Sequence, residues 1–236
     1  MSHLTIFPVQ GVGEVGDGDD LVTLFLDALT AHGDELRAND VVIVTSKVVS
    51  KAEGRVVPVD ETDAGREALI AQESVRVLRR RGPLRITETT HGFVNANAGI
   101  DYSNTAAGTA VLLPVDPDRS ARRFRAEIGR RTALEVGVII TDTFGRTWRN
   151  GVTDVAIGVA GVRPILDLRG TTDGHGRMLE VTEVAIVDEI AGAANLVLAK
   201  DAQTPFAVVR GLNPLFFGEG SVVGDVVRSA NGDLFR

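Results

Sequence analysis

The sequence predicts a fold of mixed α and β structure. Short β-branched runs are interspersed with segments whose apolar residues recur every three or four positions. At 236 residues, of which 44% are hydrophobic, the chain is long enough to bury a substantial core, and it contains no regular internal repeat. Both an α+β and an α/β organisation agree with this pattern. The length allows either one large domain or two lobes.

The N-terminal part of the chain predicts a strand, a glycine loop, a helix and a second strand. Residues 4–9 read as a short strand, glycines follow within residues 11–18, and an amphipathic helical pattern begins at Leu21. Residues 41–45 form a compact β-branched run, which predicts a buried strand. The polar residues 46–51 follow it directly, and we expect them to form a loop.

The central part predicts two helices around a polar segment. The apolar spacing within residues 63–81, together with a basic end, predicts a helix that stops at Gly82. Residues 87–109 are polar and rich in glycine, which predicts a ligand-binding loop before a strand at 110–114. The next helix is expected to run to Ala133, with a cap at Asp118 or Ser120.

Later elements follow the same alternation. Residues 136–141 predict a strand, and Asp142 is expected to emerge where that strand ends. A helix is expected to begin near Thr182, and residues 207–209 predict a final strand.

Charge and cysteine content exclude several classes of function. The chain has 25 basic and 32 acidic residues, a net charge of -7, so it lacks the basic excess of a nucleic-acid-binding protein. It has no cysteine, so any metal must be bound by oxygen or imidazole. There is neither a signal sequence nor an apolar run of roughly 20 residues that would span a membrane. We therefore expect a cytoplasmic protein without membrane contact.

The glycine loop allows two interpretations. Gly11, Gly13 and Gly16 match the dinucleotide-binding fingerprint between a strand and a helix, which indicates an NAD-dependent oxidoreductase. Glu14 and Asp17, however, place negative charge where a pyrophosphate needs positive potential. The structural alternative is a turn whose acidic residues favour the N-terminus of the next helix.

The segment after the second strand is a candidate anion site. Ser46 and Ser50 offer hydroxyl groups, and Lys47 and Lys51 offer flexible positive charge to a phosphate. The spacing differs from a P-loop, and a solvated loop is the alternative interpretation.

Two acidic segments are candidate metal ligands. Asp101 and Asn104 lie in an oxygen-rich stretch, for which turn formation is the alternative. Asp142 and Thr143 present a carboxylate and a hydroxyl group of the kind that Mg²⁺ or Mn²⁺ prefers beside nucleotide phosphates. A structural ion pair between Asp142 and Arg146 competes with that interpretation.

Four separate motifs together resemble one known family, the coenzyme F420:L-glutamate ligases. The resemblance spans nearly the whole chain and extends to the N-terminal ligase domain of the bifunctional actinobacterial enzyme. The motifs are Ser46-Lys47-Val48-Val49-Ser50-Lys51, Asn97-Ala98-Gly99-Ile100-Asp101-Tyr102-Ser103-Asn104, Thr141-Asp142-Thr143-Phe144-Gly145-Arg146 and Val208-Val209-Arg210-Gly211. By this resemblance, residues 1–236 are one ligase domain with an F420 ligase-like fold, and we expect no flavin reductase-like domain in the chain.

The resemblance implies roles for individual residues. The implied GTP site contains Gly11, Val12, Gly13, Glu14, Ser46, Lys51 and Asn104. The implied ligands of the divalent metals, Mg²⁺ or Mn²⁺, are Asp101, Asp142 and Thr143. Asp101, Asp142 and Lys51 would then be the catalytic residues, with Lys51 stabilising phosphate charge. The sequence departs from the family pattern at Lys200, which stands where we align a glutamine that binds metal. Because a protonated lysine cannot bind a metal, this departure argues against a metal contact at that position.

The resemblance also implies the reaction and the partners. L-glutamate would be joined to coenzyme F420-0 through an activated carboxylate, with GTP converted to GDP and phosphate. K⁺ is allowed as an additional cation. The enzyme would be a homodimer. The number of γ-linked glutamates stays open. The alternatives are the NAD-dependent oxidoreductase and a non-catalytic nucleotide-binding module.

Overall fold

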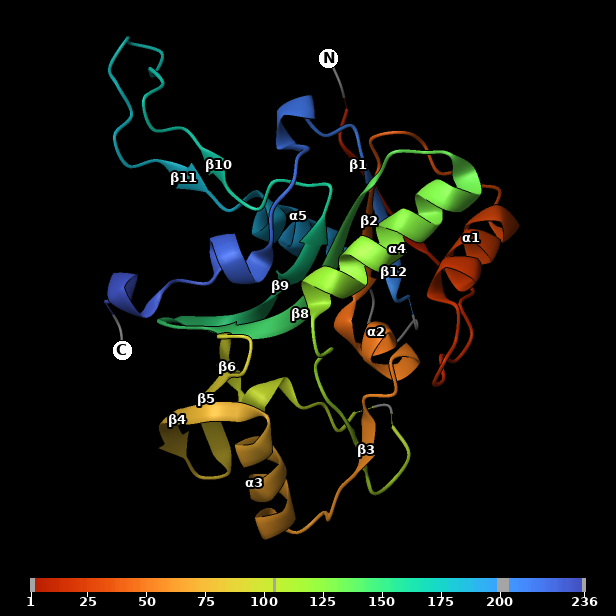
Figure 1. Cartoon of the computed structure of the whole chain (residues 1–236), viewed down its shortest axis with the longest axis vertical. Helices are drawn as coiled ribbons and strands as arrows, with labels where there is room; N and C mark the ends of the chain where they lie inside the picture. Colours follow the sequence, from red (N-terminus) through yellow and green to blue (C-terminus); the bar gives the residue numbers. More distant parts are fainter. Residues whose placement is uncertain (1–2, 104, 199–203, 235–236) are drawn as a thin grey trace.

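The main feature of the fold is a five-stranded sheet in the order β1–β12–β2–β8–β9 (Figure 1). The structure is a computed structural model that describes residues 3–103, 105–198 and 204–234. β2 and β8 are parallel neighbours, whereas the other neighbouring pairs of this sheet are antiparallel. The strands are β1 (Thr5–Val9), β2 (Val41–Thr45), β8 (Gly137–Arg146), β9 (Arg149–Ala160) and β12 (Phe206–Arg210). The predicted mixed α and β fold is confirmed.

Helices cover both faces of this sheet. Figure 1 shows α1 (Leu21–Ala31) and α4 (Pro117–Thr132) in front of it and α5 (Ile186–Ala194) behind it. The rings of Phe25, Phe124 and Phe206 join α1 and α4 to β12, with centroids 5.5 to 6.1 Å apart. All three are buried, so this aromatic cluster fixes the front layer against the sheet.

A second, smaller core lies below the main sheet in Figure 1. Here β3 (Val56–Pro58) pairs with β7 (Thr109–Val111), and α3 (Asp63–Gln72) precedes a three-stranded antiparallel sheet. That sheet contains β4 (Ser74–Arg81), β5 (Leu84–Thr89) and β6 (Val94–Ala96), and the short 3₁₀ turn η1 (Asn97–Gly99) follows it. Ile70, Ile100 and Leu112 are buried in this core. The segment that carries Asp101 therefore belongs to the lower part of the molecule.

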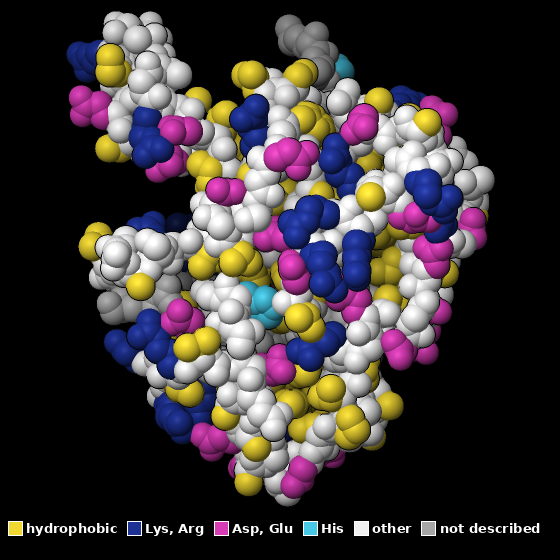
Figure 2. Space-filling view, in the orientation of Figure 1, with side chains coloured by type: hydrophobic (Ala, Val, Ile, Leu, Met, Phe, Trp, Pro, Cys, Tyr) yellow, Lys and Arg dark blue, Asp and Glu magenta, His cyan; other side chains and the backbone are white. Residues whose placement is uncertain are grey.

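The remaining elements lie at the periphery. A hairpin of β10 (Leu166–Asp167) and β11 (Glu183–Val184) projects from the body, and the C-terminal region has the short turns η2 (Pro214–Phe216), η3 (Val222–Val226) and η4 (Ala230–Gly232). No helix in the described part of the chain is long and apolar enough to cross a membrane. Figure 2 shows acidic and basic side chains mixed over one face, with Lys and Arg gathered over α4.

Three predictions about the position of helices are wrong. Residues 46–51 are not a loop but belong to α2 (Ser46–Ala52), which begins directly after β2. The single helix predicted over residues 63–81 is the helix α3 followed by the strand β4, because Val75 and Val77 favour extended structure and the strand pairs with β5. The helix expected near Thr182 begins only at Ile186.

Asp118 was expected as a possible helix cap, but Asp116 caps α4 and Asp118 joins three segments instead. The side chain of Asp118 is buried, and its Oδ1 accepts hydrogen bonds from Val159 N at 2.9 Å and Val222 N at 3.0 Å. Its Oδ2 accepts one from Val223 N at 3.2 Å. The carboxylate thereby ties β9 and η3 to the start of α4.

The substitution Asp118→Asn is expected to lower the free energy of unfolding by about 1–3 kcal/mol, because an amide NH₂ must then face a backbone N–H group. Urea unfolding measures the change. The matched control is Asp27→Asn on the exposed face of α1, for which we expect a change below about 0.5 kcal/mol. Equal effects of the two substitutions would show that the buried carboxylate has no special role.

Candidate active site

The ends of β2 and β8 bring two distant motifs together. The strands are parallel and Thr45 is paired with Thr141, so Ser46 and Asp142 follow at the same edge of the sheet. Ser46 is the first residue of α2, and its Oγ donates a hydrogen bond of 2.7 Å to Asp142 Oδ1. The strand does not end at residue 141 as predicted, and Asp142 lies within β8, which continues to Arg146. The two residues are separated by 96 positions in the sequence.

Asp101 joins this edge through Lys47. The backbone of Asp101 exchanges two hydrogen bonds of 2.9 Å with Val111, which fixes the residue against β7. Lys47 Nζ lies 2.6 Å from Asp101 Oδ2 and also donates to Ser103 O and Oγ at 3.1 Å. Burial raises the pKa of Asp101, but the hydrogen bonds from Lys47 and Ser103 outweigh it, so the pKa lies below its ordinary value. Asp101 is thus a carboxylate held ionised by a lysine.

Asp142 has the opposite electrostatic character. Its pKa is raised from 3.8 to about 7, and burial is the largest cause. The negative charges of Asp154 and Asp101 add to this shift, while hydrogen bonds from the Ser46 hydroxyl and the Thr143 N–H oppose it. The carboxylates of Asp154 and Asp101 therefore both disfavour a negative charge on Asp142, and a cation at this edge would offset that effect.

The raised pKa of Asp142 has a measurable effect on stability in the absence of metal. Because the folded protein favours the protonated carboxyl, its contribution is complete below about pH 4 and is lost as the pH rises through about 7. With EDTA present, Asp142→Asn should therefore become progressively more stable relative to the wild type between pH 4 and 8. Melting temperatures across this range measure the difference. A constant difference between the two proteins would contradict the prediction.

A third carboxylate, Asp154, was not predicted from the sequence. It lies on β9 directly opposite Thr143 on β8, is only 5% exposed, and its Oδ1 accepts a 2.7 Å hydrogen bond from Thr143 Oγ1. The strand β9 was also missed. A signal was present, because an aspartate inside the largely apolar run 152–160 is a charge that the fold must bury.

The donor set fits a hard divalent cation. Carboxylate and hydroxyl oxygens are provided by Asp101, Asp142 and Thr143, the three predicted ligands. Among the described residues, no three His, Asp or Glu side chains are close enough to enclose a metal ion by themselves. Mg²⁺ in nucleotide sites is commonly bound by one or two carboxylates together with phosphates and water. The arrangement therefore suits a metal that arrives with a nucleotide.

The remaining predicted site residues lie around α2. Gly18 N donates a 3.0 Å hydrogen bond to Ala52 O, so the glycine loop ends against the last turn of α2. In this loop Gly11 has a φ of +79°, Gly13 and Glu14 are exposed, and Val12 is buried in the core. The loop thus lies beside the helix that carries Ser46.

Lys51 is also on α2 and is half-buried. Because it follows Ser46 by five residues, its side chain leaves the helix roughly 140° around the axis from that of Ser46. Lys47, and not Lys51, is the lysine that contacts Asp101. Asn104 and Lys200 lie outside the described residues.

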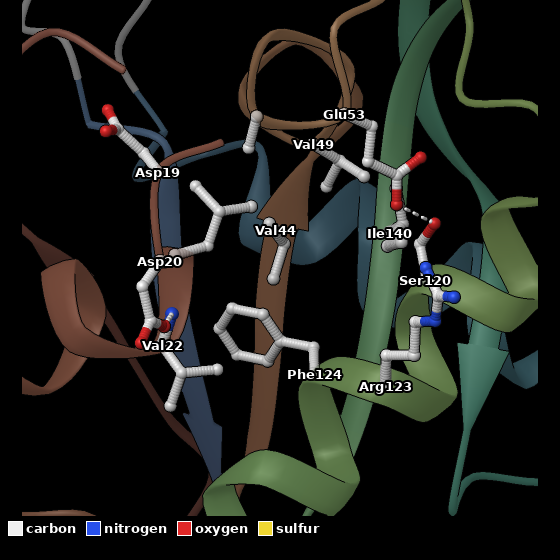
Figure 3. Close-up of a pocket in the computed structure, with 12 residues that line it drawn as sticks. Asp19, Asp20, Val22, Val44, Val49, Glu53, Ser120, Arg123, Phe124 and Ile140 are labelled. Atoms are coloured by element: carbon white, nitrogen blue, oxygen red, sulfur yellow. Dashed lines mark hydrogen bonds between the residues drawn. The ribbon is translucent and has the colours of Figure 1, made fainter. Parts of the chain in front are cut away.

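A pocket of about 220 Å³ lies between the start of α1, α2 and α4 (Figure 3). Val44 and Ile140 of the sheet and Phe124 of α4 line it. Its acidic groups already have partners, since Asp20 caps α1 and pairs with Arg131, and Glu53 accepts a hydrogen bond from Ser120. None of the predicted site residues that the structure describes lines this pocket.

Comparison with known proteins agrees with the motifs at this edge. The model of the family described as F420-0:Gamma-glutamyl ligase matches residues 11–211. A coenzyme F420:L-glutamate ligase of Methanothermobacter thermautotrophicus is 38% identical over 249 residues, covering 99% of both chains. Those of Methanopyrus kandleri and Archaeoglobus fulgidus are each 39% identical, covering 99% of this chain and 98% and 97% of theirs. With a family model that matches residues 11–211 and relatives 38–39% identical over nearly the whole chain, the chain belongs to the F420-0:gamma-glutamyl ligase family.

Proposed function

We propose that this protein ligates L-glutamate to coenzyme F420-0, using GTP and a divalent metal ion, Mg²⁺ or Mn²⁺. The observation that carries the proposal is the convergence of Ser46, Asp101 and Asp142 at the ends of β2 and β8. Family membership supports the reaction, because the relatives named above are coenzyme F420:L-glutamate ligases.

The proposed roles follow from the positions of the side chains. Asp101, Asp142 and Thr143 would hold the metal, which when bound would neutralise phosphate charge beside the reacting oxygen atoms. Ser46 would contact the nucleotide at the first residue of α2, where its hydroxyl already donates to Asp142. Lys47 and Lys51 would add positive charge from α2, and Lys47 already contacts Asp101.

The proposed reaction proceeds in two steps. A carboxylate oxygen of F420-0 attacks the γ-phosphorus of GTP, and the bond to the bridging oxygen breaks, which releases GDP and forms an acyl phosphate. The amine of glutamate then attacks the acyl carbon, loses a proton and displaces inorganic phosphate, leaving an amide bond. Binding both substrates at one edge reduces the entropic part of the barrier.

The decisive experiment measures GDP release from GTP in the presence of F420-0, Mn²⁺ and L-glutamate, together with the mass of the product. GDP release that requires both F420-0 and glutamate, with a product heavier by one or more glutamyl units, is the expected result. F420-0 labelled with ¹⁸O in its carboxylate should transfer label to phosphate, and unlabelled phosphate would contradict the acyl phosphate. Nucleotide binding without turnover would instead indicate a non-catalytic module.

The NAD-dependent oxidoreductase is less well supported. In a dinucleotide-binding fold the first turn of the helix after the glycine loop receives the pyrophosphate. Here the side chain of Asp20 accepts hydrogen bonds from the N–H groups of Val22 and Thr23 at 3.1 Å and thereby fills that position. In addition, β1 and β2 are not adjacent, because β12 lies between them.

Two further proposals concern the state of the protein. We propose a homodimer, which the mass in solution by light scattering would test. We propose a cytoplasmic location, which fractionation of cells that produce the protein would test.

A further inference from the structure

We propose that Asp154 is a positioning residue that orients the hydroxyl of Thr143 for binding a divalent cation. The inference rests on the proposed function, because that function makes Thr143 a metal ligand. It adds a residue that neither the sequence motifs nor the resemblance includes, and it explains why a buried carboxylate lies on the edge strand of the main sheet.

The geometry of the pair is specific. Thr143 and Asp154 are directly opposite each other on the antiparallel strands β8 and β9, so their side chains share one face of the sheet. Thr143 Oγ1 donates its only hydrogen to Asp154 Oδ1 at 2.7 Å. A hydroxyl group has one hydrogen and two lone pairs. With the hydrogen directed at Asp154, both lone pairs of Thr143 Oγ1 remain available to a cation.

Burial makes this orientation stable. Asp154 is 5% exposed and Thr143 is half-buried, so little water competes for the hydroxyl hydrogen. A carboxylate behind a metal ligand increases the electron density on that ligand and fixes its direction, and removing such a group commonly weakens metal binding about 10–100-fold.

The pair of Thr143 and Asp154 is separate from the pair of Asp142 and Ser46. Asp142 and Thr143 are consecutive residues of β8. Asp142 is held by Ser46, whereas Thr143 is held by Asp154. Each of the two neighbouring ligands on β8 therefore has its own partner that fixes its direction.

The test measures Mn²⁺ binding by the whole protein, by calorimetry and by the electron paramagnetic resonance signal of free Mn²⁺. Asp154→Ala and Thr143→Val are each expected to raise the dissociation constant for Mn²⁺ about 10–100-fold. The double variant should bind no more weakly than the weaker single variant, because both substitutions remove the same interaction. Asp154→Asn, whose amide oxygen still accepts the hydrogen bond, should lose less affinity than Asp154→Ala.

Asp188→Asn is the matched control. Asp188 is also a partly buried carboxylate packed against β9, but it accepts a hydrogen bond from Ala156 N at 3.0 Å and not from Thr143. Its substitution should leave Mn²⁺ affinity unchanged, and melting temperatures show whether each variant is folded. Wild-type affinity in folded Asp154→Ala, or additive losses in the double variant, would overturn the proposed role of Asp154 alone. A wild-type protein that binds no Mn²⁺ would overturn the metal assignment of the proposed function as well.

Discussion

Asp142→Asn is expected to reduce glutamate-dependent GDP release by at least about 100-fold while the protein stays folded. The substitution removes one negative charge from the site and changes the side-chain volume little, so the loss should be concentrated in the chemical step. The amide that replaces the carboxylate retains an oxygen that can accept the 2.7 Å hydrogen bond from Ser46, which preserves the connection between β8 and α2. The measurement compares turnover at saturating GTP and Mn²⁺ with the melting temperature of the same preparation.

Two companion variants sharpen this result. Asp101→Asn should also reduce turnover strongly, because Asp101 is the carboxylate that Lys47 holds ionised at the same edge. Asp167→Asn, in the exposed hairpin of β10 and β11, changes the same chemical group far from the site and should leave turnover within a factor of about two. Turnover of Asp142→Asn within about tenfold of the wild type would contradict a metal-binding role.

Two strands of the site, β2 and β8, could be predicted from local sequence, whereas β9 and the junctions could not. Residues 41–45 and 138–141 are β-branched and almost all apolar, so they indicate buried strands directly. The helix after residue 45 was missed because Val48 and Val49 have low helix propensity, and a helix of seven residues depends on packing more than on propensity. Here Val49 is buried in the main core, which explains why the segment is helical.

The assembly of the site depends on contacts between distant segments. Asp101 was identified as a candidate from its local oxygen-rich segment, but its pairing with Lys47 follows from the packing of the smaller core below the main sheet. Asp154 was missed because Gly151 and Gly158 interrupt the pattern of β9 and hide a strand of twelve residues. Residue types thus indicated the chemistry, while the partners of each side chain required the register of β8 against β2 and β9.

The motif at residues 208–211 lies at the other end of the sheet from the site. Val209 is paired with Val41 at the start of β2, whereas Ser46 follows the last residue of β2, roughly 16 Å further along the strand. Gly211 has a φ of +90°, and a Cβ atom there would lie 2.2 Å from the carbonyl oxygen of His3. This part of the motif therefore has a structural role.

Arg210→Met is accordingly expected to lower the free energy of unfolding by about 3–5 kcal/mol. Arg210 forms two hydrogen bonds with Asp40, from Nε at 2.8 Å and from Nη2 at 2.7 Å, and Asp40 is only 1% exposed. Removing the guanidinium leaves this buried carboxylate without its cation, and methionine keeps much of the apolar stem. Urea unfolding measures the loss, and Arg210→Lys should be intermediate because an ammonium cannot form the paired contacts.

Arg169→Met provides the control that separates burial from charge. Arg169 pairs with Asp167 at 2.7 Å in a similar two-bond arrangement, but both side chains are about half exposed, so the expected loss is below about 1 kcal/mol. At a temperature where Arg210→Met is still folded, its turnover should match the wild type, since Arg210 and Ser46 lie at opposite ends of the sheet. A small loss of stability together with a large loss of turnover would contradict the structural role of the 208–211 motif, because it would show that the motif takes part in catalysis.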